Sequence, residues 1–218
     1  PTPHGISMSK AQRGVPFAET GLSLPCVVKP CCGGSSIGVT IVRTADEYEA
    51  ALDEAFKYEN EIVIEDYICG REFSVGVIGG KSLPIIEIIP KSGVYDYETK
   101  YQPGMAEDVC PAPLSDEITD KMQTYAIDVY RELKLGSYAR IDFLLDADDN
   151  MYCLEANTLP GMTATSLLPQ EAKVLGIEYG VLCEQVIAQA LATYNGETEE
   201  LPAPGTNSHY GKDDLKSL

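Results

Sequence analysis

Two short stretches, Arg140-Ile-Asp142 and Glu155-Ala-Asn157, contain the residue types that bind metal ions. They lie in strand-like runs on either side of an acidic turn. If these runs form one β-hairpin, Asp142 faces Glu155 and Arg140 faces Asn157, whether the loop has two or four residues. Because side chains alternate along a strand, all four then lie on one face. The other face is predicted to be the apolar core face, with Ile141, Phe143, Leu145, Tyr152 and Leu154.

Two carboxylates that are directly opposed on a sheet repel each other, so we expect a cation between Asp142 and Glu155. Carboxylate and amide oxygens are hard ligands that suit Mg²⁺, which usually completes its shell with water and substrate phosphates. The sequence therefore predicts a Mg²⁺ site at Asp142, Glu155 and Asn157 that works with a nucleotide. The alternative is an exposed hairpin whose charges are solvated.

A glycine-rich loop over residues 31–38 separates two apolar strand-like runs. Its backbone N–H groups and the hydroxyls of Ser35 and Ser36 can approach an anion closely. Lys29 ends the preceding run, where a lysine needs an anionic partner. These features favour a phosphate-binding loop, and an ordinary glycine-rich turn is the alternative.

Two further segments suit binding. Residues 95–101 mix aromatic and charged side chains in a long stretch with little apolar periodicity, and such a piece can fold over a site and exclude water. Residues 158–167 follow Asn157 and are rich in hydroxyl groups, which suits a carboxylate or an oxyanion. A solvated loop and a helix-capping loop are the respective alternatives.

The elements that must position these residues follow from periodicity and turn residues. Helices are predicted over about 45–58 behind a capping box at Thr44, from Ser115 to Gly136, and over 179–192. Strands are predicted at 25–29, 39–42, 62–64, 73–78, 83–89, 138–145 and 151–155. Strands and helices in this mixed order predict an α+β fold.

The sequence divides into four parts. Residues 1–24 form an N-terminal arm or the remnant of a preceding region, because they show no clear periodicity. Two α+β subdomains follow at 25–90 and 91–194, and residues 91–113 of the second act as a lid. Residues 195–218 form a flexible tail, since Gly, Pro and charged residues dominate there.

Composition excludes several classes of function. The chain has 218 residues, 44% of them hydrophobic, which is enough to bury a sizeable core. Its 34 acidic and 16 basic residues give a net charge of −18, which argues against nucleic acid and membrane partners. Without a membrane-length apolar run or a secretion signal, a cytoplasmic location is expected. The seven cysteines are odd in number and include no CxxC pair, so reduced thiols are expected.

Four motifs, VVKPCCGGSSIGV, YDYETKY, ARIDFLLD and EANTLPGMTATSL, together resemble D-alanine:D-alanine ligases of the ATP-grasp superfamily. The resemblance covers about residues 24–192. It implies an ATP-grasp fold in which two α+β subdomains clamp ATP between them, and a homodimer, since family members are often dimers. Family members also carry an N-terminal domain that is absent from this sequence, and 18 residues separate Lys10 from Lys29 where a further strand and helix are expected.

The resemblance also implies roles for individual residues. Asp142, Glu155 and Asn157 match the magnesium ligands, in agreement with the hairpin argument. The positions that match ATP-binding residues are Lys29, Lys100, Ser36, Glu65, Tyr67, Ile68, Glu72 and Lys10. The positions that match catalytic residues are Arg140 and Gly161 at the oxyanion, Ser35 in the closing loop, and Tyr101 in the omega loop. Ser166 and Leu167 match the residues that hold the carboxylate of the second D-alanine.

The implied reaction joins two D-alanine molecules. One carboxylate attacks the γ-phosphorus of ATP, and Mg²⁺, with Mn²⁺ as an alternative, neutralises the developing charge together with the lysines. The amine of the second D-alanine then attacks the acylphosphate, and the tetrahedral oxyanion collapses to D-alanyl-D-alanine, a peptidoglycan precursor.

Two other functions stay open at this point. A Mg-ATP-binding module without catalysis has no need of Arg140 or Ser166, so their presence favours an enzyme. A ligase that joins D-alanine to D-lactate or D-serine is disfavoured by Tyr101, because ester-forming members depart from that tyrosine.

Overall fold

The structure is a computed structural model that describes residues 1–34, 36–90, 106–197 and 203–210. The chain divides into two compact units, one of Pro1–Cys69 with Pro90–Glu107 and one of Gly70–Ile89 with Asp108–Leu218. Residues 70–89, predicted to belong to the first subdomain, therefore lie in the second unit. The reason is strand pairing, because β5 (Arg71–Ile78) pairs along its whole length with β9 (Tyr138–Leu145).

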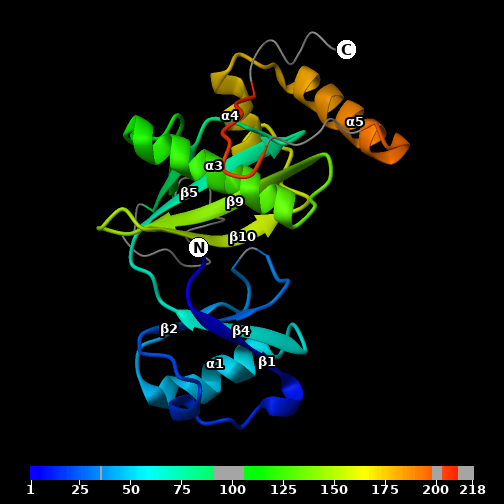
Figure 1. Cartoon of the computed structure of the whole chain (residues 1–218). Helices are drawn as coiled ribbons and strands as arrows, with labels where there is room; N and C mark the ends of the chain where they lie inside the picture. The colour runs from blue at the N-terminus through cyan, green and yellow to red at the C-terminus, as the bar shows by residue number, and fades with distance from the viewer. Residues whose placement is uncertain (35, 91–105, 198–202, 211–218) are drawn as a thin grey trace. The chain divides into compact units, whose positions relative to one another are not determined.

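The first unit contains an antiparallel sheet in the order β1-β4-β2-β3, with α1 (Tyr48–Ala55) against one face (Figure 1). Its strands are β1 (Gly5–Ser9), β2 (Cys26–Pro30), β3 (Thr40–Val42) and β4 (Glu61–Asp66). The predicted capping box is confirmed, since the backbone N–H of Thr44 donates to Glu47 Oε2 at 3.2 Å. The first turn of the predicted helix is a 3₁₀ turn, η3 (Ala45–Glu47).

Residues 1–24 differ from the predicted arm. Gly5–Ser9 form the edge strand β1, antiparallel to β4, and Met8 is 3% exposed in the core of the first unit. Short 3₁₀ turns follow at Lys10–Gln12 and Phe17–Glu19. The strand has little local signal because Gly and Ser are weak strand formers and its partner is remote in the sequence.

The second unit contains a six-stranded sheet in the order β10-β9-β5-β7-β8, with β6 paired to β5. The remaining strands are β6 (Lys81–Ser82), β7 (Ile86–Pro90), β8 (Ala106–Val109) and β10 (Met151–Asn157). The end of the predicted lid is thus strand β8, and residues 91–105 of the lid lie outside the described residues. The α+β class is confirmed.

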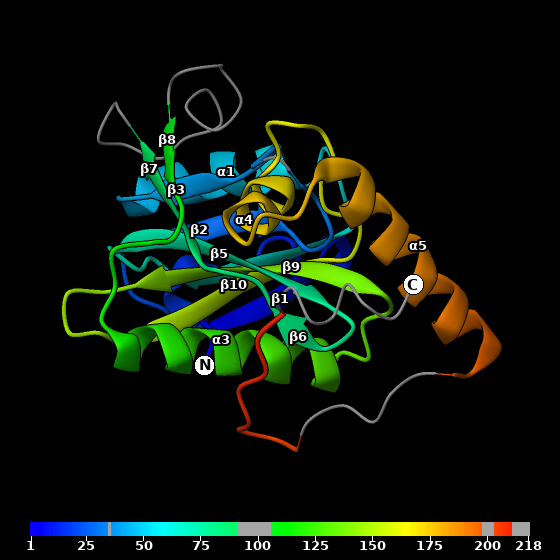
Figure 2. The same ribbon diagram turned by 90° about the horizontal axis from the view of Figure 1, so that it is seen from above.

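Two helices cover opposite faces of the second sheet (Figure 2). One face packs against α3 (Asp116–Glu132) through a core that includes Phe73, Val75, Ile141 and Phe143. The other face meets α4 (Leu167–Val174), which is followed by α5 (Tyr179–Asn195). The predicted start of α3 is confirmed, because Ser115 Oγ accepts a hydrogen bond from the N–H of Ile118 at 3.3 Å.

Part of the predicted flexible tail is docked on this unit. Ser82 donates its N–H to the carbonyl of Ser208, and Tyr210 donates its N–H to the carbonyl of Ser82, both at 2.8 Å. Tyr210 is 4% exposed. The tail pairs with a short edge strand instead of remaining in solvent, and an isolated bridge of this kind leaves no periodicity in the sequence.

All seven cysteines are free in this structure. Within the described residues, no single helix combines the length and apolar character needed to cross a membrane.

Candidate functional site

The β9–β10 hairpin carries the predicted polar set on one face of the second sheet. Asp142 pairs with Glu155, and Arg140 pairs with Asn157, so the predicted register is confirmed at these positions. Alternation places the four side chains on the same face.

The predicted apolar face is correct on β9 and wrong on β10. The predicted β9 residues Ile141, Phe143 and Leu145 are buried. On β10 the register shifts between Cys153 and Glu155, which leaves Leu154 as an extra residue in a β-bulge. The core positions of β10 are consequently Met151, Cys153 and Ala156, and not the predicted Tyr152 and Leu154.

Asp142 lies at the centre of a buried hydrogen-bond network and is 1% exposed. Arg140 donates from Nε to Oδ1 at 2.9 Å and from Nη2 to Oδ2 at 2.8 Å. Ser74, opposite Asp142 on β5, donates from Oγ to Oδ1 at 2.9 Å. Asn157 Nδ2 donates to Asp142 Oδ2 and to Glu155 Oε1, both at 3.1 Å. In this structure the positive charge that lies against Asp142 is the guanidinium of Arg140.

Opposing influences act on the pKa of Arg140. Burial lowers the pKa, and the charge and hydrogen bonds of Asp142 raise it by more, with further contributions from Glu155 and Glu171. The net result is a pKa above the ordinary value, so Arg140 stays positively charged throughout the working pH range. A permanent positive charge at this position is suited to stabilising an oxyanion.

The donor set is compatible with Mg²⁺. Within the described ranges, no group of three or more His, Cys, Asp or Glu side chains is arranged to hold a metal ion. Asp142 and Glu155 offer two carboxylates, and Mg²⁺ commonly takes one or two carboxylates and completes its shell with water and phosphate oxygens. Asn157 would add its amide oxygen only after a turn of its side chain, because here Nδ2 faces the two carboxylates. A cation that binds Asp142 has to displace at least one of the hydrogen bonds that Arg140, Ser74 and Asn157 donate to it.

The loop after β10 brings two more predicted residues together. A Cβ atom placed on Gly161 would lie 2.8 Å from Ser166 Oγ, so only a glycine allows this approach. Ser166 Oγ accepts a hydrogen bond from the N–H of Thr163 at 3.0 Å and lies 2.8 Å from Thr163 Oγ1. Ser166 is the N-cap residue of α4 and Leu167 is the first residue of that helix, where backbone N–H groups suit a carboxylate.

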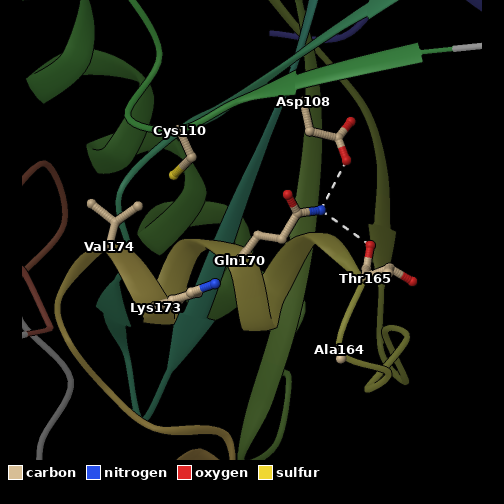
Figure 3. A pocket seen from close by; sticks show the side chains of 7 residues that line it. All are labelled: Asp108, Cys110, Ala164, Thr165, Gln170, Lys173 and Val174. Atoms are coloured by element: carbon tan, nitrogen blue, oxygen red, sulfur yellow. Dashed lines mark hydrogen bonds between the residues drawn. The ribbon is translucent and has the colours of Figure 1, made fainter. Parts of the chain in front are cut away.

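A pocket of about 570 Å³ lies beside this loop (Figure 3). Gln170 spans it, donating from Nε2 to Asp108 Oδ2 at 2.8 Å and to the carbonyl of Thr165 at 3.1 Å. Burial, and secondarily the charge of Glu171, raise the pKa of Cys110 to about 12, so this thiol is not a nucleophile. None of the predicted site residues lines the pocket.

In the first unit, the buried end of β2 places Lys29 against a carboxylate. Lys29 Nζ lies 2.6 Å from Glu65 Oε1, and the two side chains are 22% and 9% exposed. Both residues were predicted to contact ATP, and here each neutralises the other.

The other predicted ATP residues are more dispersed. Tyr67 and Ile68 follow β4, and Tyr67 is exposed. Ser36 has a positive φ of 55° in the glycine-rich loop, and Lys10 is exposed in the first 3₁₀ turn. Glu72 belongs to the second unit and is 7% exposed on β5. Ser35, Lys100 and Tyr101 lie outside the described residues.

Sequence reasoning missed two residues of the network. Ser74 is a polar residue in an otherwise apolar strand, and that contrast is the signal that marks it. Glu171 lies in α4, a helix that was not predicted, and it is completely buried. Only packing reveals it.

Comparisons with known proteins agree with this fold. Residues 7–188 match the family described as D-ala D-ala ligase C-terminus. A D-alanine–D-alanine ligase of Syntrophotalea carbinolica is 42% identical over 190 residues, which cover 86% of this chain and 62% of the relative. The ligase of Geotalea uraniireducens is 47% identical over 174 residues, which cover 80% of this chain and 56% of the relative.

Solved structures show the same relationship. The D-alanine–D-alanine ligase of Bacillus anthracis superposes with a TM-score of 0.79 at 38% identity, over 90% of this chain and 64% of that chain. The same enzyme complexed with ATP gives a TM-score of 0.74 at 33% identity, over 90% of this chain and 61% of that chain.

The chain spans about three fifths of the length of these relatives. Over that span the sequence match, the mixed α+β architecture and the shared structure coincide. The chain therefore belongs to the D-alanine–D-alanine ligase family and contains its carboxyl-terminal ATP-grasp region.

Proposed function

We propose that this chain carries out the ATP-dependent ligation of two D-alanine molecules to D-alanyl-D-alanine, through an acylphosphate, for peptidoglycan precursor synthesis. The observation that supports the proposal most directly is the polar face of β9 and β10. There, two carboxylates, an amide and a partly buried arginine share one face in a chain of this family.

In this proposal the two ends of ATP meet different groups. Lys29 binds the phosphates after it exchanges its contact with Glu65, and Ser36 helps the glycine-rich loop to close over them. Glu65, Tyr67, Ile68 and Glu72 hold adenine and ribose. The relative crystallised with ATP supports a nucleotide as the ligand. The remaining residues proposed to contact ATP or close the site over it are Ser35, Lys10, Lys100 and Tyr101.

Asp142, Glu155 and Asn157 would hold the magnesium ion, which supplies charge neutralisation for the transferring phosphoryl group when it is bound. Arg140 remains protonated beside them and offers N–H donors to the developing oxyanion, and the backbone at Gly161 adds another. Ser166 and the first turn of α4 at Leu167 orient the carboxylate of the second D-alanine, so that its amine reaches the acylphosphate.

Electrons and protons balance in two steps. A carboxylate oxygen of the first D-alanine attacks the γ-phosphorus, the bond to ADP breaks, and an acylphosphate forms. The amine of the second D-alanine attacks the acyl carbon, the tetrahedral oxyanion collapses, and phosphate leaves with one proton lost from the new amide nitrogen.

The test combines calorimetric titration of Mg-ATP into the chain with a phosphate-release assay in the presence of D-alanine. We expect Mg-ATP binding and D-alanine-dependent release. In E155Q we expect both to weaken, because a metal ligand loses its charge, and in R140Q we expect binding to persist while release stops.

The matched control is E132Q, an exposed glutamate at the end of α3 that should change neither quantity. Binding without release would overturn ligation by this chain and leave a Mg-ATP-binding module. Absence of binding would overturn the nucleotide assignment as a whole.

A further inference from the structure

Glu171 is a fully buried carboxylate with one oxygen unpaired. Its Oε2 accepts the backbone N–H of Gly76 at 2.6 Å, whereas Oε1 has no hydrogen-bond partner among the described residues. Apolar side chains of Leu83 and Leu168 pack at the same point over Gly76. A buried carboxylate that is only half satisfied lowers stability, so packing alone does not explain it.

The sheet places this carboxylate next to Arg140. Gly76 is the direct cross-strand partner of Arg140 in the pairing of β5 with β9. A Cβ atom on Gly76 would lie 2.5 Å from Glu171 Oε2, so the carboxylate occupies the position where the side chain of residue 76 would otherwise be. Directly opposed side chains on one face start about 5 Å apart. Glu171 thus occupies, from α4, the place of a cross-strand neighbour of Arg140.

Arg140 therefore lies between two buried carboxylates. Along its own strand it donates to both oxygens of Asp142, using Nε and Nη2. A guanidinium has five N–H donors in a planar fork, so those on the other terminal nitrogen remain available for a second acceptor. Burial raises the pKa of Glu171 above its ordinary value; the Gly76 N–H and the charge of Arg140 offset this only in part, and Asp142 adds to it. A guanidinium that moves from Asp142 towards Oε1, with the charge of Asp142 neutralised by a cation, favours the ionised form of Glu171.

Asp142 cannot serve Arg140 and a divalent cation equally. Its two oxygens already accept from Arg140, Ser74 and Asn157. A cation at Asp142 repels the guanidinium and competes for the same lone pairs. Glu155 lies on the same face but is itself a proposed ligand of that cation, which leaves Glu171, with its unpaired Oε1, as the buried acidic group available to Arg140.

We propose that Glu171 is a positioning residue for Arg140, and that it retains the guanidinium on the site face when Asp142 binds a divalent cation. The inference rests on the proposed function for its purpose, because Arg140 there stabilises the oxyanion. The inference says that Arg140 and a cation compete for Asp142, and that Glu171 is the alternative partner of Arg140. This competition can be measured without nucleotide or D-alanine.

The experiment measures Mn²⁺ binding to the full chain by electron paramagnetic resonance, with Mn²⁺ alone as the probe. Four proteins form a double-mutant cycle: the unmodified chain, E171Q, R140Q and the double variant. Glutamine at 171 keeps the size of the side chain and can still accept the Gly76 N–H. Glutamine at 140 can still donate to Asp142, which protects folding.

We expect E171Q to weaken Mn²⁺ binding by about tenfold, because Arg140 then loses the one buried carboxylate that the cation does not also need. In the R140Q background the same substitution should change the affinity by less than about twofold. A merely structural role, or the loss of a nearby negative charge, would lower the affinity in both backgrounds alike.

A second variant, G76A, reaches the same contact from the sheet, since its Cβ would displace the Glu171 carboxylate. We expect it to weaken Mn²⁺ binding in the same way. Unchanged affinity in both E171Q and G76A, or equal losses with and without Arg140, would overturn the inference. If the four Mn²⁺ affinities follow the expected pattern but the unmodified chain does not ligate D-alanine, the result counts against the proposed function alone.

Discussion

Lys29 Nζ lies 2.6 Å from Glu65 Oε1, and this ion pair is largely shielded from water in the first unit. Both partners sit in neighbouring strands, β2 and β4, so the pair is a fixed part of the sheet. A phosphate that approaches Lys29 must compete with Glu65, and the carboxylate left behind needs a new donor. A ribose hydroxyl could supply that donor under the proposed function.

The first prediction concerns this pair. K29M leaves Glu65 buried without its partner, so we expect the free energy of unfolding to fall by about 3 kcal/mol and Mg-ATP affinity to fall at least about tenfold. Urea unfolding and calorimetry measure the two effects. The matched control is K57M, which removes the exposed pair of Lys57 with Glu54 and should change neither quantity. Equal stability of K29M and K57M would contradict this prediction.

The second prediction concerns Gly161. In G161A the new Cβ would lie 2.8 Å from Ser166 Oγ and push this hydroxyl away from its contacts with Thr163. We expect the KM for D-alanine to rise by about tenfold, while Mg-ATP binding stays unchanged. The control is G180A, where no atom lies within 4 Å of the added Cβ. An unaltered KM in G161A would show that Ser166 does not hold the substrate carboxylate.

The third prediction is a pH dependence of stability that originates in Glu171. Burial raises its pKa well above the ordinary value of 4.5, and the Gly76 N–H and Arg140 offset this only in part, while Asp142 adds to it. Between pH 4.5 and the raised pKa, the folded state binds more protons than the unfolded state. The free energy of unfolding therefore falls as pH rises through this window.

E171Q removes this dependence, so it should gain stability relative to the unmodified chain as pH rises from about 4 to about 8. Urea titrations at a series of pH values measure the difference. Burial, and secondarily the charge of Glu171, raise the pKa of Cys110 to about 12, so this neighbouring thiol stays neutral over the range and does not contribute to the difference. E132Q serves as the control, and its free energy of unfolding should change with pH as that of the unmodified chain does. The same pH dependence in E171Q would contradict the prediction.

The fourth prediction concerns the docked part of the tail. Tyr210 Oη donates to Gln185 Oε1 at 2.8 Å in a buried position. Y210F leaves that oxygen without this donor, so we expect a loss of about 1–2 kcal/mol in the free energy of unfolding. Y194F is the matched control, because Tyr194 is 89% exposed and its change should have no effect. Chemical denaturation of both variants decides the point.

The hairpin shows how far local pattern carries a prediction. The pairing of Asp142 with Glu155 followed from the assumed hairpin, and their shared face followed from alternation, since a two-residue period needs only neighbouring residues. The same period failed for Tyr152 and Leu154, because nothing in the sequence marks the position of a bulge. Strand β1 was missed for a related reason, since its pairing partner β4 is distant in the chain.

The polar network shows a second limit. Arg140 and Asp142 were recognised from residue type, whereas Glu171 acts through the packing of α4 over Gly76, which no local pattern encodes. The docked tail was also not predictable from local pattern, because its contacts with Ser82 and Gln185 depend on tertiary structure.

The bulge at Leu154 also bears on how sequences in this family should be compared. Removing the unpaired residue would leave Cys153 on the core side and Glu155 on the polar side, because a regular strand then joins them. Strand length in this hairpin is thus free to vary by one residue without exchanging its two faces. An alignment counted from the turn would displace the carboxylate by one column in a shorter relative, whereas an alignment anchored on Glu155 keeps equivalent side chains together.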